Sequence, residues 1–251
     1  MSELNLYFRQ DLGMRKGKLA AQIAHAACAQ LLNAMDDGGD VRLLPYAAYV
    51  TLQGLLHDLA VHVHPVENEV ALRNALLDPA NASIIIDRGL TEFGGVPTLT
   101  TAAQGAFSAS PRKAVPMSGA DLIARQWFVF SKERPLPKDH AARMAAIGCL
   151  KMMNQLMSRP TDAEDQAVLP LRDPALRGWL TAGFGKIGMG IKTDAALKGL
   201  REALEGQQIP TVSLEMNGTQ LLVIGPQFPE TVAPIMGRES DLYASGILSL
   251  L

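Results

Sequence analysis

An internal repeat constrains the fold of this chain more than any other feature of its 251 residues. A shift of 121 positions pairs the segment 19–33 with the segment 140–154. A shift of 128 positions pairs 83–91 with 211–219, so that Ser-Ile-Ile-Ile-Asp aligns with Thr-Val-Ser-Leu-Glu. A duplicated structural unit explains two such matches better than chance does. We therefore expect two similar domains with a linker rich in Pro, Ser and Gly between them, over residues 1–110 (first domain), 111–122 (linker) and 123–251 (second domain).

Within each domain, alternating helical and extended patterns predict an α/β fold with a sheet covered on both faces. Runs of apolar residues predict strands, and runs with a helical period predict helices. In the first domain we expect strands at about 4–9, 59–64, 83–87 and 98–103, and helices at about 15–35 and 67–77. The expected architecture is two similar three-layer α/β/α domains, each with a small four-stranded mixed sheet.

Polar side chains gather on one face of the first predicted helix. Lys18, Gln22 and His25 fall at i, i+4 and i+7, among small and apolar residues, so they share a face about two turns long. Asp87 stands at the carboxyl end of a buried strand, where open α/β sheets place their ligands, and Gly89 permits a turn directly after it. These groups predict one site. An ordinary ion pair between Lys18 and Asp87, bracing helix to strand, would place the same residues in the same positions.

These residues resemble the type II peptidyl-tRNA hydrolases. The family motif Arg-x-Asp-Leu-x-Met-x-x-Gly-Lys-x-Ala-x-Gln-x-x-His-Ala is matched position for position by the segment 9–26. A second motif, Asp-x-Gly-x-Thr, is matched by the segment 87–91, and the Thr-rich strand after it is matched less well. In this strand and next to it, the residues that replace the family's Gly, Ile and Pro are Pro97, Gln104 and Ala106.

The resemblance implies hydrolysis of the ester that joins a peptide to the terminal ribose of a tRNA, with the acceptor end of peptidyl-tRNA as the partner. This chemistry needs a group that orients or deprotonates a water and a cation that stabilises the oxyanion. It implies that Asp87 handles the water directly or through His25, that Lys18 meets the oxyanion or the ribose and terminal phosphate, and that Thr91 holds the Asp87 loop. The residues implied in substrate binding are Arg9, Arg15, Lys16, Gln22, Thr98 and Thr100.

The second domain keeps the scaffold and loses these reactive groups. Its segment 221–226 ends in Ile-Gly-Pro, as the family strand does. The two shifts place Asp139, Arg143, Ala146 and Glu215 at the positions of Lys18, Gln22, His25 and Asp87. A carboxylate in place of the ammonium reverses the local charge, so we expect this domain to be catalytically silent. Because the family works as a homodimer, we expect a pseudo-dimer whose domains pair within one chain or across two.

The remaining composition predicts a cytoplasmic protein that needs no cofactor. Cys28 and Cys149 occupy equivalent apolar helix positions, which indicates core packing in a reducing compartment. His62 and His64 could share one side of a strand, but no third ligand is evident near them, so we expect no metal. No apolar run approaches the roughly 20 residues of a membrane span, and we expect neither a membrane segment nor a signal peptide.

The charge of the first domain leaves two other functions open. Residues 1–110 contain seven Lys and Arg against eleven Asp and Glu, whereas nucleic-acid-binding proteins are usually basic. One alternative is a non-catalytic binding or scaffold protein that retains the hydrolase fold. Another is a hydrolase of a small ester or amide. Salt separates the first alternative from the enzyme, because tRNA affinity falls steeply with salt whereas a scaffold would not bind tRNA.

Overall fold

The first half of the chain folds around a four-stranded mixed sheet. A computed structural model describes residues 2–89, 92–108, 124–160, 165–181, 185–236 and 248–251. The first sheet has the strand order β4-β1-β6-β5, with β1 parallel to β4 and antiparallel to β6, and β6 antiparallel to β5. Its elements are β1 (Leu4–Arg9), α1 (Lys16–Asn33), β4 (Val61–Val66), α3 (Glu69–Ala75), a short 3-10 helix (Pro79–Asn81), β5 (Ser83–Asp87) and β6 (Thr98–Gly105).

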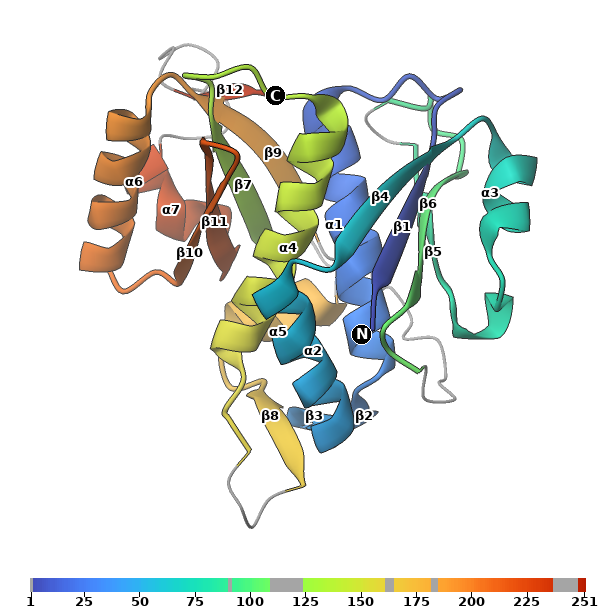
Figure 1. The fold of residues 1–251 in the computed structure, drawn as a ribbon. Coiled ribbons are helices and arrows are strands. Elements are labelled where there is room, and N and C mark those ends of the chain that lie inside the picture. The colour runs from blue at the N-terminus through green and yellow to red at the C-terminus, as the bar shows by residue number, and fades with distance from the viewer. Residues whose placement is uncertain (1, 90–91, 109–123, 161–164, 182–184, 237–247) are drawn as a thin grey trace.

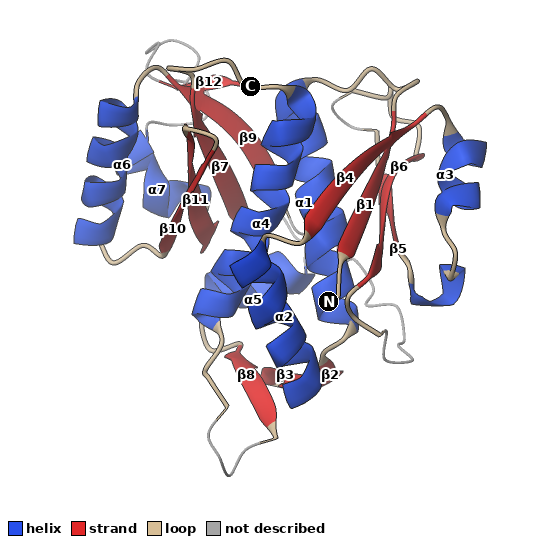
Figure 2. Ribbon diagram, viewed as in Figure 1, coloured by secondary structure: helices blue, strands red, loops and turns tan. Residues whose placement is uncertain are grey.

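Helices cover both faces of this sheet, as the sequence predicts. The helix α1 packs on β1, β5 and β6, and α3 packs on β1, β4 and β6 (Figure 2). The start of α3 is set by Asn68, whose side chain accepts a hydrogen bond from the backbone N–H of Ala71. The predicted α/β layering is therefore confirmed in this half.

The second half of the chain folds around a five-stranded sheet of order β10-β11-β7-β9-β12. If β12 is set aside, its strand order and strand directions are those of the first sheet. The fifth strand, β12, pairs antiparallel with β9 and is an addition to the four expected strands. The elements are β7 (Arg125–Ser131), α4 (Lys138–Leu156), β9 (Lys186–Ile191), α6 (Asp194–Gly206), β10 (Thr211–Met216), β11 (Thr219–Gln227), α7 (Pro229–Met236) and β12 (Leu248–Leu250).

The helices α1 and α4 pack against each other between the two sheets (Figure 1). Each also reaches the sheet of the other half, since α1 contacts β9 and α4 contacts β4. Small residues allow this approach: a Cβ atom added to Gly17 would lie 2.9 Å from the carbonyl oxygen of Gly188, and one added to Gly188 would lie 2.6 Å from the Cα of Gly17. One apolar core runs through both halves, and Cys28 and Cys149 are fully buried in it, as predicted.

A small third sheet joins the two halves at the opposite end of the molecule from the starts of α1 and α4 (Figure 1). In this sheet β3 pairs with β2 of its own half and with β8 of the other half. None of the strands of this sheet, and neither of the two helices next to them, is predicted from the sequence. They are β2 (Asp36–Asp37), β3 (Val41–Pro45), α2 (Tyr46–Asp58), β8 (Gln166–Pro170) and α5 (Pro174–Thr181).

The predicted linker and the expected lack of a membrane segment can be compared with the structure only where it describes residues. The predicted linker, 111–122, lies outside them. Among the helices in the described ranges, none combines the length and the apolar character needed to cross a membrane.

Candidate active site

The carboxylate of Asp87 is held by three hydrogen-bond donors at the end of β5. Its Oδ2 atom lies 2.5 Å from Lys18 Nζ and 2.7 Å from Gln22 Nε2, and its Oδ1 atom accepts the backbone N–H of Gly89 at 2.8 Å. The side chains of Lys18 and Asp87 are 15% and 13% exposed, so water screens this ion pair weakly. The predicted meeting of ammonium, amide and carboxylate is confirmed by these contacts.

Two local features of the chain bring the three donors close to the carboxylate of Asp87. Lys18 and Gln22 are one turn apart on α1, so both side chains reach the same end of β5. Gly89 has a φ of 79°, and a Cβ atom there would lie 2.5 Å from the carbonyl oxygen of Val96. The chain therefore needs glycine at this turn, which folds the backbone N–H of residue 89 back onto Asp87.

A β-bulge fixes the amide of Gln22. Ile85 pairs with Thr101 and Ile86 pairs with Leu99, so Thr100 is the extra residue of β6. Successive side chains of a regular strand point to opposite faces, but the bulge lets two successive threonines face α1. Thr100 Oγ1 donates to Gln22 Oε1 at 2.7 Å, and Thr101 Oγ1 donates to the backbone oxygen of Gln22 at 3.1 Å. With its oxygen bound to Thr100, the amide presents its nitrogen to Asp87.

Residues 2–105 match the family model for Peptidyl-tRNA hydrolase PTH2. This segment of the chain belongs to that family. The matched residues, which we call the PTH2 segment, include α1, β5 and β6 and therefore every group that holds Asp87. No curated protein matches the chain.

The other predicted site residues of the PTH2 segment take different positions. His25 is half-buried on α1 and is not among the described contacts of Asp87, so the route through this imidazole stays a prediction. Thr98 lies opposite Asp87 in the sheet, and its hydroxyl donates to the carbonyl of Val96 at 2.9 Å. Thr91 lies outside the described residues.

Three of the four predicted cations form ion pairs. Lys18 pairs with Asp87, and Arg15 Nε lies 2.6 Å from Glu92 Oε1. Arg9 lies 2.7 Å from Asp11 and 3.0 Å from Glu69, and its hydrogen bond to Asp11 raises the pKa of Arg9 and lowers that of Asp11. Lys16, the first residue of α1, makes no ion pair with any described residue.

Two residues next to the site are not predicted from the sequence. Glu92 holds Arg15, and the ring of Phe93 lies with its centroid 5.5 Å from Lys18 Nζ. Both are in the irregular segment between β5 and β6, where no periodic pattern marks a residue as functional.

The departure at Gln104 lies away from Asp87. Its amide donates to the hydroxyl of Tyr7 and to the carbonyl of Ala75, and its oxygen accepts the N–H of Leu77. These partners belong to the α3 side of the sheet, so the substitution braces α3 and leaves the α1 side of β6 unchanged.

Contacts in the second half correct the residue correspondence by one position. The loop from β1 to α1 and the loop from β7 to α4 match at a shift of 122, because β1 ends at Arg9 and β7 at Ser131. His140 then takes the position of Lys18, and its Nε2 atom lies 3.2 Å from the oxygen of Met216, the last residue of β10. The shift of 121 gives the best sequence match between the two helices, but the residues of α1 and α4 that take the same place in the structure are 122 positions apart.

Arg143 does not take the position of Gln22 either. Its guanidinium donates to the carbonyls of Leu59 and Val61 in the first half, at 2.9 and 2.8 Å, and so braces α4 against β4. At the shift of 122, Met144 is the residue that takes the position of Gln22, and it is fully buried. Among the described residues, His62 and His64 included, no group of three or more His, Cys, Asp or Glu side chains that could hold a metal ion is found.

Proposed function

We propose that the protein hydrolyses the ester bond of peptidyl-tRNA and releases tRNA. The PTH2 match supports this activity at the level of the family. The observation that carries the proposal to this chain is the carboxylate of Asp87, held between the ammonium of Lys18 and the amide of Gln22.

The two oxygens of Asp87 have different tasks in this proposal. Oδ2 is occupied by two side-chain donors, whereas Oδ1 has one backbone donor and retains a lone pair for a water. A water oriented by Oδ1 attacks the carbonyl carbon of the ester, and its proton passes to Asp87 directly or through His25. The ester C–O bond then breaks, and the leaving ribose oxygen takes up a proton. Lys18 stabilises the negative charge that develops on the carbonyl oxygen.

Release of N-acetylaminoacyl groups from tRNA by the purified protein tests the proposal. We expect Lys18→Ala and Asp87→Asn each to lower turnover by about 10²-fold or more, the usual cost of losing a group that acts on the transition state. Lys198→Ala, which removes an exposed lysine of α6, is the matched control and should retain full activity.

Thermal melts of the same variants separate catalysis from bracing. If Lys18→Ala and Asp87→Asn unfold earlier but hydrolyse peptidyl-tRNA at the rate of the natural protein, the ion pair is structural and the catalytic proposal is wrong.

One observation favours a second candidate, a non-catalytic binding protein that keeps the hydrolase fold. The cations Arg9, Arg15 and Lys18 of the PTH2 segment are paired with carboxylates and contribute little attraction for a phosphate backbone. A stable natural protein that neither cleaves N-acetylaminoacyl-tRNA nor binds tRNA at low salt would favour this candidate.

We also infer that the two halves are copies of one unit that pair within the chain as a pseudo-dimer, with a catalytically silent second copy. The common strand order of the two sheets and the packing of α1 on α4 support this inference. In this inference His140 and Met216 take the places of Lys18 and Asp87, so no pair of an ammonium and a carboxylate is present there among the described residues of the second half.

A further inference from the structure

Three of the cations around Asp87 are poorly suited to bind phosphate. Arg15 and Lys18 each have a carboxylate within 2.6 Å, and Arg9 has two carboxylates within 3.0 Å. A paired cation presents little net charge, whereas binding of a nucleic-acid backbone depends on cations that replace condensed counterions. If the substrate is a tRNA, its phosphates need cations other than these three. In the same segment, Lys16 and the exposed Arg88 form no ion pair with any described residue.

The second half supplies cations with neutral partners. Lys138 at the start of α4 is exposed, and its Nζ atom donates to the carbonyl oxygen of Met14 at 2.9 Å. Lys132 is exposed, and its Nζ atom donates to the hydroxyl of Ser249 at 2.9 Å. Arg134 is exposed and lies against Gly218. Neither these two lysines nor this arginine has an ion pair with any residue in the described ranges.

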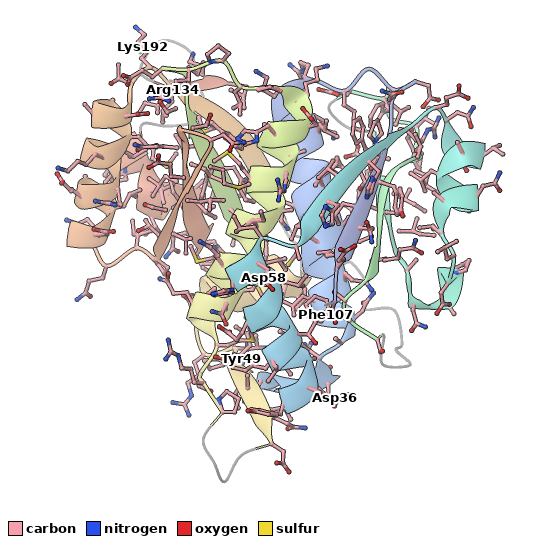
Figure 3. The ribbon with its side chains drawn as sticks, in the orientation of Figure 1. Asp36, Tyr49, Asp58, Phe107, Arg134 and Lys192 are labelled. Atoms are coloured by element: carbon pink, nitrogen blue, oxygen red, sulfur yellow. The ribbon has the colours of Figure 1, made fainter. Side chains whose placement is uncertain are left out.

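These residues lie at the edge of the molecule where the candidate active site is. Met14, the partner of Lys138, directly precedes Arg15, and the backbone N–H of Gly17 donates to the carbonyl of Leu251 at 2.8 Å, next to β12. Both α1 and α4 begin at this edge (Figure 1), and Arg134 lies along it (Figure 3). The loop from β7 to α4 therefore continues the surface that starts at Lys16.

Acidic residues in the same region are held at helix N-termini. Glu133 Oε2 accepts the backbone N–H of Asp194 at 2.8 Å, at the start of α6. Asp139 lies in the first turn of α4, and Asp194 lies in the first turn of α6. The partial positive charge of a helix N-terminus offsets such carboxylates, so they weaken the field of the neighbouring cations only in part.

We propose that Lys16, Lys132, Arg134 and Lys138, which we call the cationic edge, bind the phosphate backbone of the tRNA acceptor stem while the ester lies at Asp87. This inference rests on the proposed function and names the task of the second half: it holds the substrate and takes no part in the bond cleavage. Three of the four residues come from the half that the PTH2 match does not reach.

The test is tRNA binding at several KCl concentrations, measured by fluorescence anisotropy with the full chain. The variant K132Q/R134Q/K138Q removes three cations from the edge. Its matched control, R159Q/R172Q/K198Q, removes three exposed cations elsewhere in the second half and changes the net charge by the same amount. We expect the edge variant to reduce the slope of log affinity against log salt by about 2 to 3, at roughly 0.9 for each duplex phosphate contact, and the control to keep the slope.

A minimal ester separates this proposal from the proposed function. N-acetylaminoacyl-adenosine has the ester but no backbone phosphates, so the edge variant should hydrolyse it at the rate of the natural protein while kcat/KM for N-acetylaminoacyl-tRNA falls. If the natural protein hydrolyses neither substrate but the edge variant alone loses tRNA binding, the enzyme proposal fails and the cationic edge stands. Natural affinity and salt slope in the edge variant, or no tRNA binding by the natural protein, would overturn the cationic edge.

The variant K132Q/R134Q guards against a folding defect, because it keeps the hydrogen bond from Lys138 to Met14. It should show about two thirds of the loss in slope, with an unchanged melting temperature.

Discussion

At the scale of single residues, the candidate active site depends on a chain of hydrogen bonds that starts two contacts away from Asp87. Thr100 donates to Gln22, and Gln22 donates to Asp87. The hydroxyl of Thr100 thereby decides which end of the amide faces the carboxylate. Without it, the buried amide could rotate and turn its oxygen toward Asp87, where two acceptors would repel each other.

Thr100→Val therefore tests positioning. We expect kcat for N-acetylaminoacyl-tRNA to fall by about tenfold, which corresponds to about 1.4 kcal/mol of transition-state stabilisation, with KM little changed. Thr51→Val on α2 is the control, because the hydroxyl of Thr51 donates to the carbonyl of Ala47 and does not contact Gln22. Equal effects of both substitutions on kcat would argue against a positioning role for Thr100.

At the scale of elements, the two halves approach each other closely where α1 packs on β9. Neither Gly17 nor Gly188 has room for a side chain, because backbone atoms of the other element, and of Leu251, fill the space. The crossing brings α1 against the second sheet at the turn of the helix that carries Lys18. The stability of the interface and the position of the ammonium are thus linked.

Gly188→Ala should push α1 away from β9. We expect the free energy of unfolding to fall by about 1 to 3 kcal/mol, the usual cost of overpacking, with a lower urea midpoint. Gly199→Ala on α6 is the matched control, since a Cβ atom there meets open space and alanine favours a helix by up to about 1 kcal/mol. If both variants shift the urea midpoint upward, the contact between α1 and β9 is looser than the distances indicate.

Sequence patterns predict the elements whose partners are local or whose periodicity is strong. The strands β1 and β5 have the predicted bounds, and α1 differs from its prediction by one residue at its start and two at its end. The strand β3 is not predicted, because it is five residues long, has no alternation of buried and exposed side chains, and pairs locally only with the two residues of β2. The meeting of Lys18, Gln22 and Asp87 could be predicted from spacing, but the bulge at Thr100 depends on strand register, which the sequence does not display.

At the scale of the whole molecule, a buried lysine of the second half lies close to one cysteine from each half of the chain. Lys186 on β9 has its Nζ atom 4.3 Å from the ring centroid of Trp179. Burial lowers the pKa of Lys186, and the nearby thiols of Cys28 on α1 and Cys149 on α4 oppose this shift. Cys149 Sγ also donates to Gln126 Oε1 at 3.3 Å. The interface between the halves therefore contains titratable groups in an otherwise apolar core.

Lys186 should make stability depend on alkaline pH. Its pKa is lower in the folded protein than the ordinary value of 10.5 that it regains on unfolding. Between these two values the unfolded chain binds more protons, so Lys186 makes the free energy of unfolding rise with pH. Below both pKa values Lys186 is charged in the folded and in the unfolded chain, so the cost of burying the charge lowers the free energy of unfolding by its full amount.

Urea denaturation of the natural protein and of Lys186→Met over this pH range measures the effect. Both proteins retain the thiols, so the difference between their pH profiles reports the lysine. We expect the contribution of Lys186 to grow more favourable as pH rises, and the methionine variant to lack it. Parallel profiles would show that Lys186 titrates alike in the folded and unfolded chain.

The pairing of β3 with β8 also bears on the order of events during synthesis. Residues 41–45 leave the ribosome long before residues 166–170, and α1 precedes α4 by about as much. Until the later partners emerge, one edge of β3 and the α4-facing side of α1 remain uncovered, and such surfaces promote association with other chains. In the nascent chain, α1 of the PTH2 segment can therefore be enclosed only after α4, and hence more than half of the protein, has been translated.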